Sequence, residues 1–268
     1  MYLPPGPVAP AGLRPALLLA HGGAYHRGSK ETDEFEQDGS HNTPMPEYCA
    51  RYAAKGFVCF SIGYRLTQEL PAPQPAPIRR GRTVHRGRID YVRGLLGLAP
   101  ATDEELVNGL EAAMADVACA FRFVQANTAS WAVDPARMAM GGFSAGAFSA
   151  IYAACALGVP AAAIVSLSGG MDPEDAAHYL HGGRGQPALL LLSSEFDRRA
   201  RKRDVDNLAV VAAPVVEHYR RVPVVGHHAL VPPVFRQVLQ ILVGEPGKLR
   251  RRLVAFARRG SQVHLETT

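Results

Sequence analysis

The fold is decided by residues 137–146, which have the sequence RMAMGGFSAG. The stretch begins with an apolar run, which two glycines and then a serine follow. It ends with a further glycine inside the small-residue segment 145–157. This order is typical of a β-strand that turns sharply into an α-helix, because glycine tolerates the bend and lets neighbouring chains pass close by. The N–H groups at the start of such a helix would point toward Ser144. The stretch therefore predicts Ser144 as a nucleophile, and a tight turn with an incidental serine is the alternative.

Further apolar runs bounded by turn residues predict buried parallel strands on both sides of this stretch. The six expected strands are 15–20, 57–62, 137–141, 161–167, 188–192 and 222–225. Helices are expected at 45–55, 103–127, 145–157, around 204–220 and at 231–243, with Asp103 as the N-cap of the longest helix. The alternation predicts an α/β fold, in which one domain over 1–268 holds a mostly parallel sheet of about six to seven strands covered by helices on both faces.

Two segments interrupt the alternation. The first is 67–102, which carries four prolines between positions 70 and 77. We expect it to be a partly irregular insertion over the carboxyl edge of the sheet, where a lid would lie. The second is the basic tail 247–268, whose last residues we expect to fray.

The composition favours an ordinary globular protein. Of 268 residues, 47% are hydrophobic and 20% charged, which excludes a wholly disordered chain. The four cysteines have no metal-binding spacing, which argues against a zinc site and a disulfide scaffold, and the histidines show no ligand spacing either. We therefore expect no metal and no cofactor. Neither a membrane-spanning run of about twenty apolar residues nor a signal peptide is recognisable, so a cytoplasmic location is expected.

The net charge of +5 is spread unevenly. Arginine and lysine cluster in 79–93, in 198–203 and in the tail, whereas 31–47 is acidic. An anionic partner such as nucleic acid is one interpretation of the basic runs, and a solvated surface is the other. We favour the solvated surface because no aromatic residues are interleaved with the charges. Neither nucleic acid nor a membrane is therefore expected as a partner.

A loop rich in small residues follows the first strand. Residues 21–25 have the sequence HGGAY, and small residues at such a turn allow backbone N–H groups to face a developing oxyanion. A second HGG lies at 181–183, but no strand precedes it and it comes after the serine, so we expect an ordinary loop there. Position relative to the strand and the serine separates the two copies.

A serine nucleophile needs a base, and the base needs an acid that orients it. In this architecture the acid follows the serine along the chain and the histidine comes last. Asp197 and Glu195 follow the strand at 188–192, and His227 and His228 follow the strand at 222–225. These groups all fall at carboxyl ends of parallel strands, where ligands bind in such sheets. Asp116, on the long helix, is expected to hydrogen-bond a nearby loop instead.

The motifs together resemble the α/β-hydrolases of the carboxylesterase and hormone-sensitive-lipase-like group. They also resemble the related small esterases, a branch with feruloyl and acetylxylan esterases and arylformamidases. The similarity runs over 17–243. It rests on HGGAY followed by Gly28-Ser29, on Tyr64-Arg65-Leu66, on Asp134-Pro135-x-Arg137, on GGFSAG and on the late GHH.

The resemblance assigns roles to particular residues. It implies Ser144 as nucleophile, with the main-chain N–H groups of Gly23, Ala24 and Ala145 as the oxyanion hole. It favours Asp197 over Glu195 as the acid, with Asp172 third, and His228 over His227 as the base. Three further residues, Tyr25, His26 and Phe143, are candidates for binding the substrate, with simple packing as the alternative.

The implied activity is that of a serine esterase acting on a small or medium carboxylic ester. An amidase, arylformamidase or peptidase would use the same triad, and a non-catalytic binding protein on the same scaffold is a third possibility. The chain departs from the family at its start, where only residues 1–3 could supply an earlier strand, so a reduced N-terminal sheet edge is expected. The resemblance implies a homodimer as one possible assembly, because the late strand and the final helix often present an edge in this group.

Overall fold

The computed structural model describes residues 1–6, 12–33, 35–37, 40–80, 84, 86–180, 187–194 and 219–224. Its elements are, in chain order, β1 (Arg14–Ala20), β2 (Glu36–Gln37), β3 (Ser40–His41), α1 (Met45–Ala53), β4 (Val58–Ile62), η1 (Thr67–Glu69), α2 (Arg86–Leu95), α3 (Asp103–Ala126), η2 (Thr128–Trp131), β5 (Val133–Phe143), α4 (Ala145–Cys155), β6 (Ala163–Leu167), α5 (Pro173–Tyr179), β7 (Ala188–Ser194) and β8 (Tyr219–Val224). All six strands expected from the sequence are confirmed, although β5 and β8 begin earlier than the apolar runs indicated.

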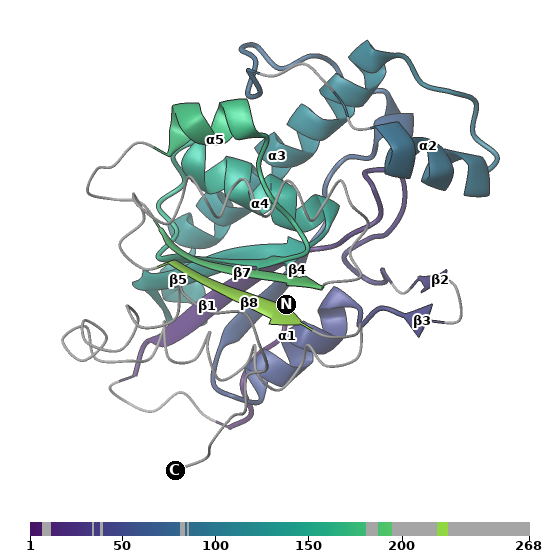
Figure 1. Cartoon of the computed structure of the whole chain (residues 1–268). Coiled ribbons are helices and arrows are strands. Elements are labelled where there is room, and N and C mark those ends of the chain that lie inside the picture. Colours follow the sequence, from purple (N-terminus) through teal and green to yellow (C-terminus); the bar gives the residue numbers. More distant parts are fainter. Residues whose placement is uncertain are drawn as a thin grey trace, which may run out of the picture.

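The six strands form one parallel sheet in the order β4-β1-β5-β6-β7-β8 (Figure 1). The chain runs outward from β1 to β4, returns past β1 to β5, and then continues in the opposite direction. The loops after β1 and β5 therefore flank the point where the strand order reverses, which is the usual ligand-binding position in open α/β sheets. The register pairs Ala20 with Gly142, so the two strands end side by side.

The helices cover both faces of the sheet, as the alternation predicts. Figure 1 shows α1 on one face and α3, α4 and α5 on the other. Right-handed crossovers explain this arrangement, because the step from β1 to β4 runs opposite to the later steps and must place its helix on the opposite face. The short helices α2 and α5 were not expected from the sequence.

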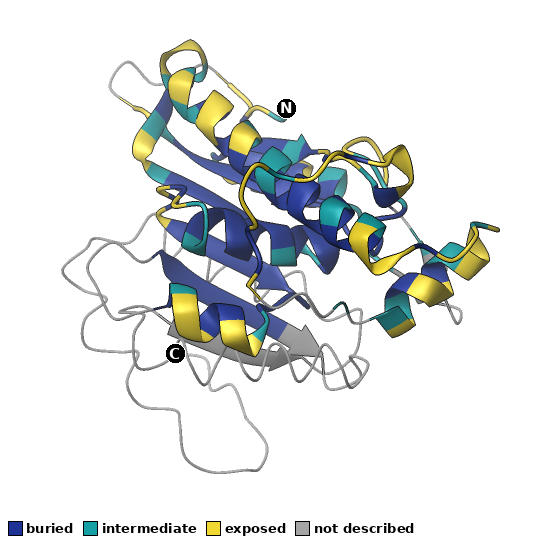
Figure 2. Ribbon diagram, turned by 90° about the horizontal axis from the view of Figure 1, so that it is seen from above, coloured by how far each residue is buried: buried dark blue, intermediate teal, exposed yellow. Residues whose placement is uncertain are grey.

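The core consists of two layers, one on each side of the sheet. Along β1, Ala16 and Leu18 belong to the layer beneath α3 and α4, whereas Leu17 and Leu19 belong to the layer beneath α1. A strand buried on both faces must be apolar throughout, which is why periodicity alone could not orient it. Figure 2 shows the central strands of the sheet in the dark blue of buried residues and the outer helix faces in the yellow of exposed ones.

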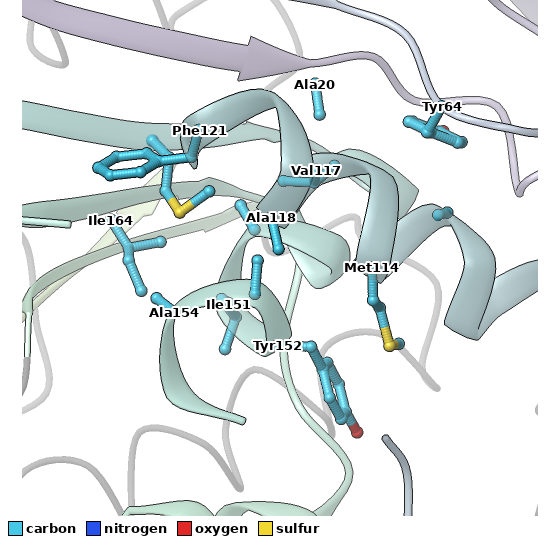
Figure 3. Packing of buried hydrophobic residues seen from close by; sticks show 14 of the residues in the cluster. Ala20, Tyr64, Met114, Val117, Ala118, Phe121, Ile151, Tyr152, Ala154 and Ile164 are labelled. Carbon is cyan, nitrogen blue, oxygen red and sulfur yellow. The ribbon is translucent and has the colours of Figure 1, made fainter. Parts of the chain in front are cut away.

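Small side chains allow α3 and α4 to pack closely over the sheet. Figure 3 shows Val117, Ala118 and Phe121 of α3 in one buried cluster with Ile151 and Ala154 of α4. These five side chains are buried, and burying a large apolar side chain such as that of Phe121 or Ile151 stabilises the fold by roughly 1.5–3 kcal/mol. This layer holds α4, and with it Ser144, against β1 and β5.

Three helix predictions need comment. The N-cap of α3 is Thr102 and not Asp103, because the Thr102 hydroxyl accepts the Glu105 N–H at 3.2 Å while the Glu105 carboxylate accepts the Thr102 N–H at 2.7 Å. The helix expected around 204–220 is wrong at its end, because β8 begins at Tyr219. The rest of that helix, the helix expected at 231–243 and the tail 247–268 lie outside the described residues.

The insertion 67–102 is attached to the body of the protein at several points. Thr67 of η1 lies against Gly109 of α3, where a Cβ would come within 2.3 Å of the Thr67 hydroxyl. The buried Glu111 carboxylate accepts the Ile78 and Arg79 N–H groups at 3.0 and 2.9 Å. Figure 1 shows α2 beyond the end of the sheet toward which β8 points.

The edge of the sheet next to β4 carries a single antiparallel bridge in the described residues. Tyr2 and Cys59 exchange two backbone hydrogen bonds of 2.7 and 3.0 Å. This agrees with the reduced N-terminal edge expected from the sequence. A search of the described helices finds none with the length and apolar character needed to cross a membrane.

Candidate functional site

Ser144 occupies a sharp turn between β5 and α4. Its backbone has φ 52° and ψ −115°, a conformation that residues with a side chain rarely adopt and that costs of order 1–3 kcal/mol. Two backbone hydrogen bonds hold it: its N–H donates to Leu167 at 2.8 Å, and its carbonyl accepts from Phe148 at 3.0 Å. Strain of this kind at a strand-to-helix turn is typical of a nucleophile elbow.

The glycines around Ser144 are required by close backbone contacts. A Cβ on Gly142 would lie 2.3 Å from the Ala20 carbonyl oxygen, and one on Gly146 would lie 2.2 Å from the same atom. Both contacts are with backbone, which cannot swing aside as a long side chain could. The N-terminus of α4 is therefore packed directly against the end of β1.

The HGGAY loop follows β1 and contains three consecutive residues with positive φ. The angles are 118° at Gly23, 55° at Ala24 and 64° at Tyr25. The Gly23 carbonyl accepts the N–H groups of His26 and Arg27 at 3.0 and 3.2 Å, which closes the turn. A Cβ at Gly23 would lie 2.0 Å from the Arg27 carbonyl oxygen, so this position also requires glycine.

The loop and the serine turn touch each other. The Phe143 ring lies where a Cβ on Gly22 would be, with Cδ1 at 2.7 Å. Within the described part of the chain, no acceptor is hydrogen-bonded to the N–H groups of Gly23, Ala24 or Ala145. The three donors predicted for the oxyanion hole thus belong to two segments that are in contact, and their role in an oxyanion hole stays a prediction.

The Asp33 carboxylate connects the HGGAY loop to the start of α1. It is buried and accepts the Met45 N–H at the start of α1 at 2.7 Å and, more weakly, the Gly22 N–H at 3.4 Å. Burial raises the pKa of Asp33 to about 6, because the two hydrogen bonds only partly offset the loss of hydration. In the sequence Asp33 is one of several acidic residues of the segment 31–47, and no pattern distinguishes it from them.

His21 and Tyr64 hold the beginning of the loop. Their rings stack with centroids 4.1 Å apart and planes 16° apart, and the Tyr64 hydroxyl donates to the His21 carbonyl at 2.9 Å. Burial lowers the pKa of His21, so its imidazole is neutral near pH 7. The first residue of HGGAY and the Tyr64-Arg65-Leu66 motif are thereby joined structurally.

His26 has partners that the sequence did not reveal. It is only 1% exposed, and its Nδ1 lies 2.7 Å from the Ala24 carbonyl oxygen while its Nε2 lies 2.9 Å from the Arg93 guanidinium. Because arginine only donates, Nε2 is the acceptor and Nδ1 carries the proton. Burial and the nearby Arg93 charge lower the pKa of His26. These contacts hold the imidazole between the loop and α2, and substrate binding by His26 stays a prediction.

The other two predicted substrate-binding residues are buried or half-buried. Tyr25 is 6% exposed and lies near the Tyr64 ring, with the centroids 6.0 Å apart. Its carbonyl accepts the N–H of Thr67, the first residue of η1, at 2.9 Å. Phe143 is half-buried and packs against the layer beneath α1. Substrate binding by either residue stays a prediction.

The predicted acid and base belong to the segments that follow β7 and β8. Asp197, Glu195, His227 and His228 lie outside the described residues, as does the second HGG at 181–183. The strands that precede the acid and the base are described: β7 ends at Ser194 and β8 at Val224.

Asp172 and Asp116 both hydrogen-bond to groups of the fold. Asp172 caps α5 by accepting the Glu174 N–H at 3.0 Å. Asp116 binds both the backbone N–H of Arg65, at 2.9 Å, and its guanidinium, at 2.8 Å, which confirms the expected hydrogen bond to a nearby loop.

Within the part of the chain that the structure describes, neither a metal-binding cluster nor either of two open cavities coincides with the position of Ser144. Among the described residues, no group of three or more His, Cys, Asp or Glu side chains could hold a metal ion. Two open cavities of about 460 and 420 Å³ lie against α3 and α5, and their described lining residues do not include Ser144.

Comparison with known proteins supports the fold. No family model matches the sequence, and no curated protein matches it significantly. Among solved structures, esterase 2 of Thermogutta terrifontis phosphoramylated by tabun is 16% identical, with 84% of this chain and 76% of that chain covered and a TM-score of 0.55. The native form of this thermophilic esterase from a Planctomycetes species gives 16% identity, coverages of 84% and 75%, and a TM-score of 0.54.

A third structure, the butyrate-bound form of the same esterase, is 17% identical over 84% of this chain and 77% of that chain, with a TM-score of 0.52. At such low identity the likeness concerns the fold. The parallel sheet, the serine turn at its reversal point and these structural neighbours together show that the chain has the α/β-hydrolase fold.

Proposed function

We propose that the protein is a serine hydrolase that cleaves a carboxylic ester of a small or medium substrate through an acyl-enzyme. The observation that carries this proposal is the strained backbone of Ser144, at φ 52° and ψ −115°, beside the HGGAY loop where the strand order reverses. A protein keeps such strain where a precise side-chain position is needed. The neighbours of known fold are esterases, which supports the same conclusion.

The proposed mechanism follows from the groups around Ser144. Its Oγ attacks the ester carbonyl while His228 takes its proton and Asp197 holds the imidazole in the required tautomer. The oxyanion of the tetrahedral intermediate accepts N–H groups from Gly23, Ala24 and Ala145. The alcohol leaves with the proton from His228, and a water molecule activated by His228 then releases the acid.

Chain position supports this choice of acid and base. Asp197 follows the end of β7 by three residues, and His228 follows the end of β8 by four. Both strands run parallel to β5, so their carboxyl ends lie at the same edge of the sheet as Ser144. This placement satisfies the order of serine, acid and histidine that the fold uses.

A short acyl group is the proposed substrate class. Esterase 2 of Thermogutta terrifontis has been solved with propionate and with butyrate bound. We therefore expect acetate, propionate and butyrate esters to be hydrolysed by this chain. Hydrolysis of p-nitrophenyl acetate and butyrate measures the preference directly.

Ser144→Ala and His228→Ala test the assignment. Each should lower kcat by about 10⁴-fold or more, because the triad acts as a unit. Ser130→Ala, which removes an exposed serine on η2, is the matched control and should retain full activity. Activity that survives Ser144→Ala would contradict the assigned nucleophile.

Paraoxon provides a test that does not require the natural substrate. The comparison protein has been solved phosphorylated by paraoxon, and we expect the same adduct on this chain. Mass spectrometry should find it in the wild type and not in Ser144→Ala. Labelling with no ester hydrolysis would favour an amidase or peptidase, which matched anilide substrates would then reveal. A folded protein that resists paraoxon and cleaves neither substrate would be a binding protein.

A further inference from the structure

Two cysteines from different elements meet in the core beneath α1. Cys49 lies on α1 and Cys59 on β4, and both are fully buried. Their sulfur atoms are 2.8 Å apart. The other two cysteines lie elsewhere: Cys119 is exposed on α3, and Cys155 lies on α4, on the opposite face of the sheet.

We propose that Cys49 and Cys59 form a buried disulfide that ties α1 to the edge strand β4. The sulfurs need to approach by less than 1 Å to reach the bond length of about 2.05 Å. They face one another across a junction between a helix and the strand that it covers. Neither Cys119 nor Cys155 competes for either sulfur, so the pairing is unambiguous.

The chemistry is a thiol–disulfide exchange with an external disulfide, such as oxidised glutathione or a protein disulfide. A Cys49 or Cys59 thiolate attacks the external disulfide and forms a mixed disulfide, releasing one thiol. The second cysteine then attacks the mixed disulfide and releases the other thiol. The two cysteines lose two electrons and two protons in total, and the external disulfide becomes two thiols.

Burial determines when the bond can form. Loss of hydration raises the pKa of the Cys59 thiol well above its usual value, and the contact with Cys49 raises it further. A buried thiol of this kind exchanges slowly, because the thiolate is the reacting species. The bond therefore forms before α1 packs on β4 and is then protected from reductants by the same burial.

The bond would fix a junction of three segments. Cys59 pairs with Tyr2 through two backbone hydrogen bonds, and α1 begins at Met45, whose N–H donates to Asp33. Cross-linking α1 to β4 closes a loop of about ten residues and restricts the unfolded chain. We expect the oxidised protein to have a melting temperature about 5–10 °C above that of the reduced protein.

The test uses the full chain with Cys119→Ser and Cys155→Ser, which leaves only the two cysteines of interest. The protein is refolded either in a mixture of oxidised and reduced glutathione or in reductant, then denatured, alkylated and digested with trypsin. Cleavage at Arg51 and Lys55 separates Cys49, in peptide 31–51, from Cys59, in peptide 56–65. The expected product of oxidative refolding is these two peptides joined by a disulfide.

The protein with Cys119→Ser and Cys155→Ser also serves to measure the effect of the disulfide on the melting temperature. Its melting temperature should be higher after oxidative refolding than after reductive refolding, and Cys49→Ala or Cys59→Ala in the same background should abolish the difference. Oxidatively refolded protein with native circular dichroism and both cysteines fully alkylated would overturn the proposal. A disulfide linking two chains, or glutathione retained on either cysteine, would overturn it as well. None of these readouts depends on the proposed hydrolase activity.

Discussion

The serine turn and the HGGAY loop both force the backbone to positive φ, but different parts of the chain hold them there. Around Ser144 the residues that permit the bend belong to the motif itself: Gly142 and Gly146 leave room for the Ala20 carbonyl oxygen, and strand and helix continue directly on either side. The loop instead depends on side chains outside its own motif, among them those of Asp33, Tyr64 and Arg93. The difference suggests that the turn is specified by its own motif, whereas the loop is specified by the fold.

The largest effect is expected at the serine turn. Gly146→Ala places a methyl group 2.2 Å from a backbone oxygen, so we expect the free energy of unfolding to fall by about 3–5 kcal/mol. Gly87→Ala is the matched control, because that glycine lies in α2 with open space around it. There alanine should stabilise by about 0.5–1 kcal/mol. Urea denaturation measures both, and equal effects would show that the turn is not held by this contact.

The second prediction concerns Asp33 and the pH dependence of stability. Its folded pKa of about 6 exceeds the ordinary value of 3.8, so the folded protein binds more protons than the unfolded chain between these values. The contribution of Asp33 to stability is therefore greatest below pH 4 and is lost as the pH rises to 6, by about 3 kcal/mol. Asp33→Asn should remove this dependence of the free energy of unfolding on pH.

The contribution of Asp33 is isolated by subtracting the pH dependence of the free energy of unfolding of Asp33→Asn from that of the wild type. Burial lowers the pKa values of His21 and His26, so their contribution to stability is lost as the pH falls below 6.5, which is the opposite slope. Both histidines remain in Asp33→Asn, so their contributions cancel when the two proteins are compared. The stability of the variant relative to wild type should rise between pH 4 and pH 7 in urea denaturation. A constant difference would show that Asp33 titrates with its ordinary pKa.

The sheet and the serine turn were predictable because their signals are local. Six apolar runs became six strands, and the glycine spacing around Ser144 identified the bend. The insertion was harder, because α2 is rich in arginine and contributes only Ile89 and Val92 to the core. Asp33, Glu111 and Asp175 look like ordinary surface carboxylates in the sequence. They are buried only because distant backbone N–H groups or a tyrosine hydroxyl bind them. The acid and base of the proposed triad stay predictions.

The third prediction tests whether the insertion controls the loop. Arg93→Ala removes the donor to His26, whose other nitrogen bonds the Ala24 carbonyl. We expect kcat for p-nitrophenyl acetate to fall about tenfold with KM little changed, because a shift of the loop misplaces the oxyanion donors. Losing the Arg93 charge also removes one of the causes that lower the pKa of His26, so we expect this pKa to rise, which an NMR titration of the ring measures.

Arg88→Ala is the control for this experiment. Arg88 lies on the same helix, with its guanidinium 5.3 Å from the Tyr91 ring centroid. Its removal should leave kcat and the pKa of His26 unchanged. Equal losses in the two variants would mean that α2 as a whole, and not the contact with His26, matters for activity.

The smallest effect is expected at Arg65 and Asp116, which hold the segment after Tyr64. The ion pair is partly exposed, so Arg65→Ala should cost only about 0.5 kcal/mol of stability. Asp116→Ala should cost more, about 1–1.5 kcal/mol, because the Arg65 backbone N–H also loses its acceptor. The double variant measured by urea denaturation should resemble Asp116→Ala, since the carboxylate serves both groups. Equal single losses would show that the side-chain pair alone positions Tyr64, and hence the start of the HGGAY loop.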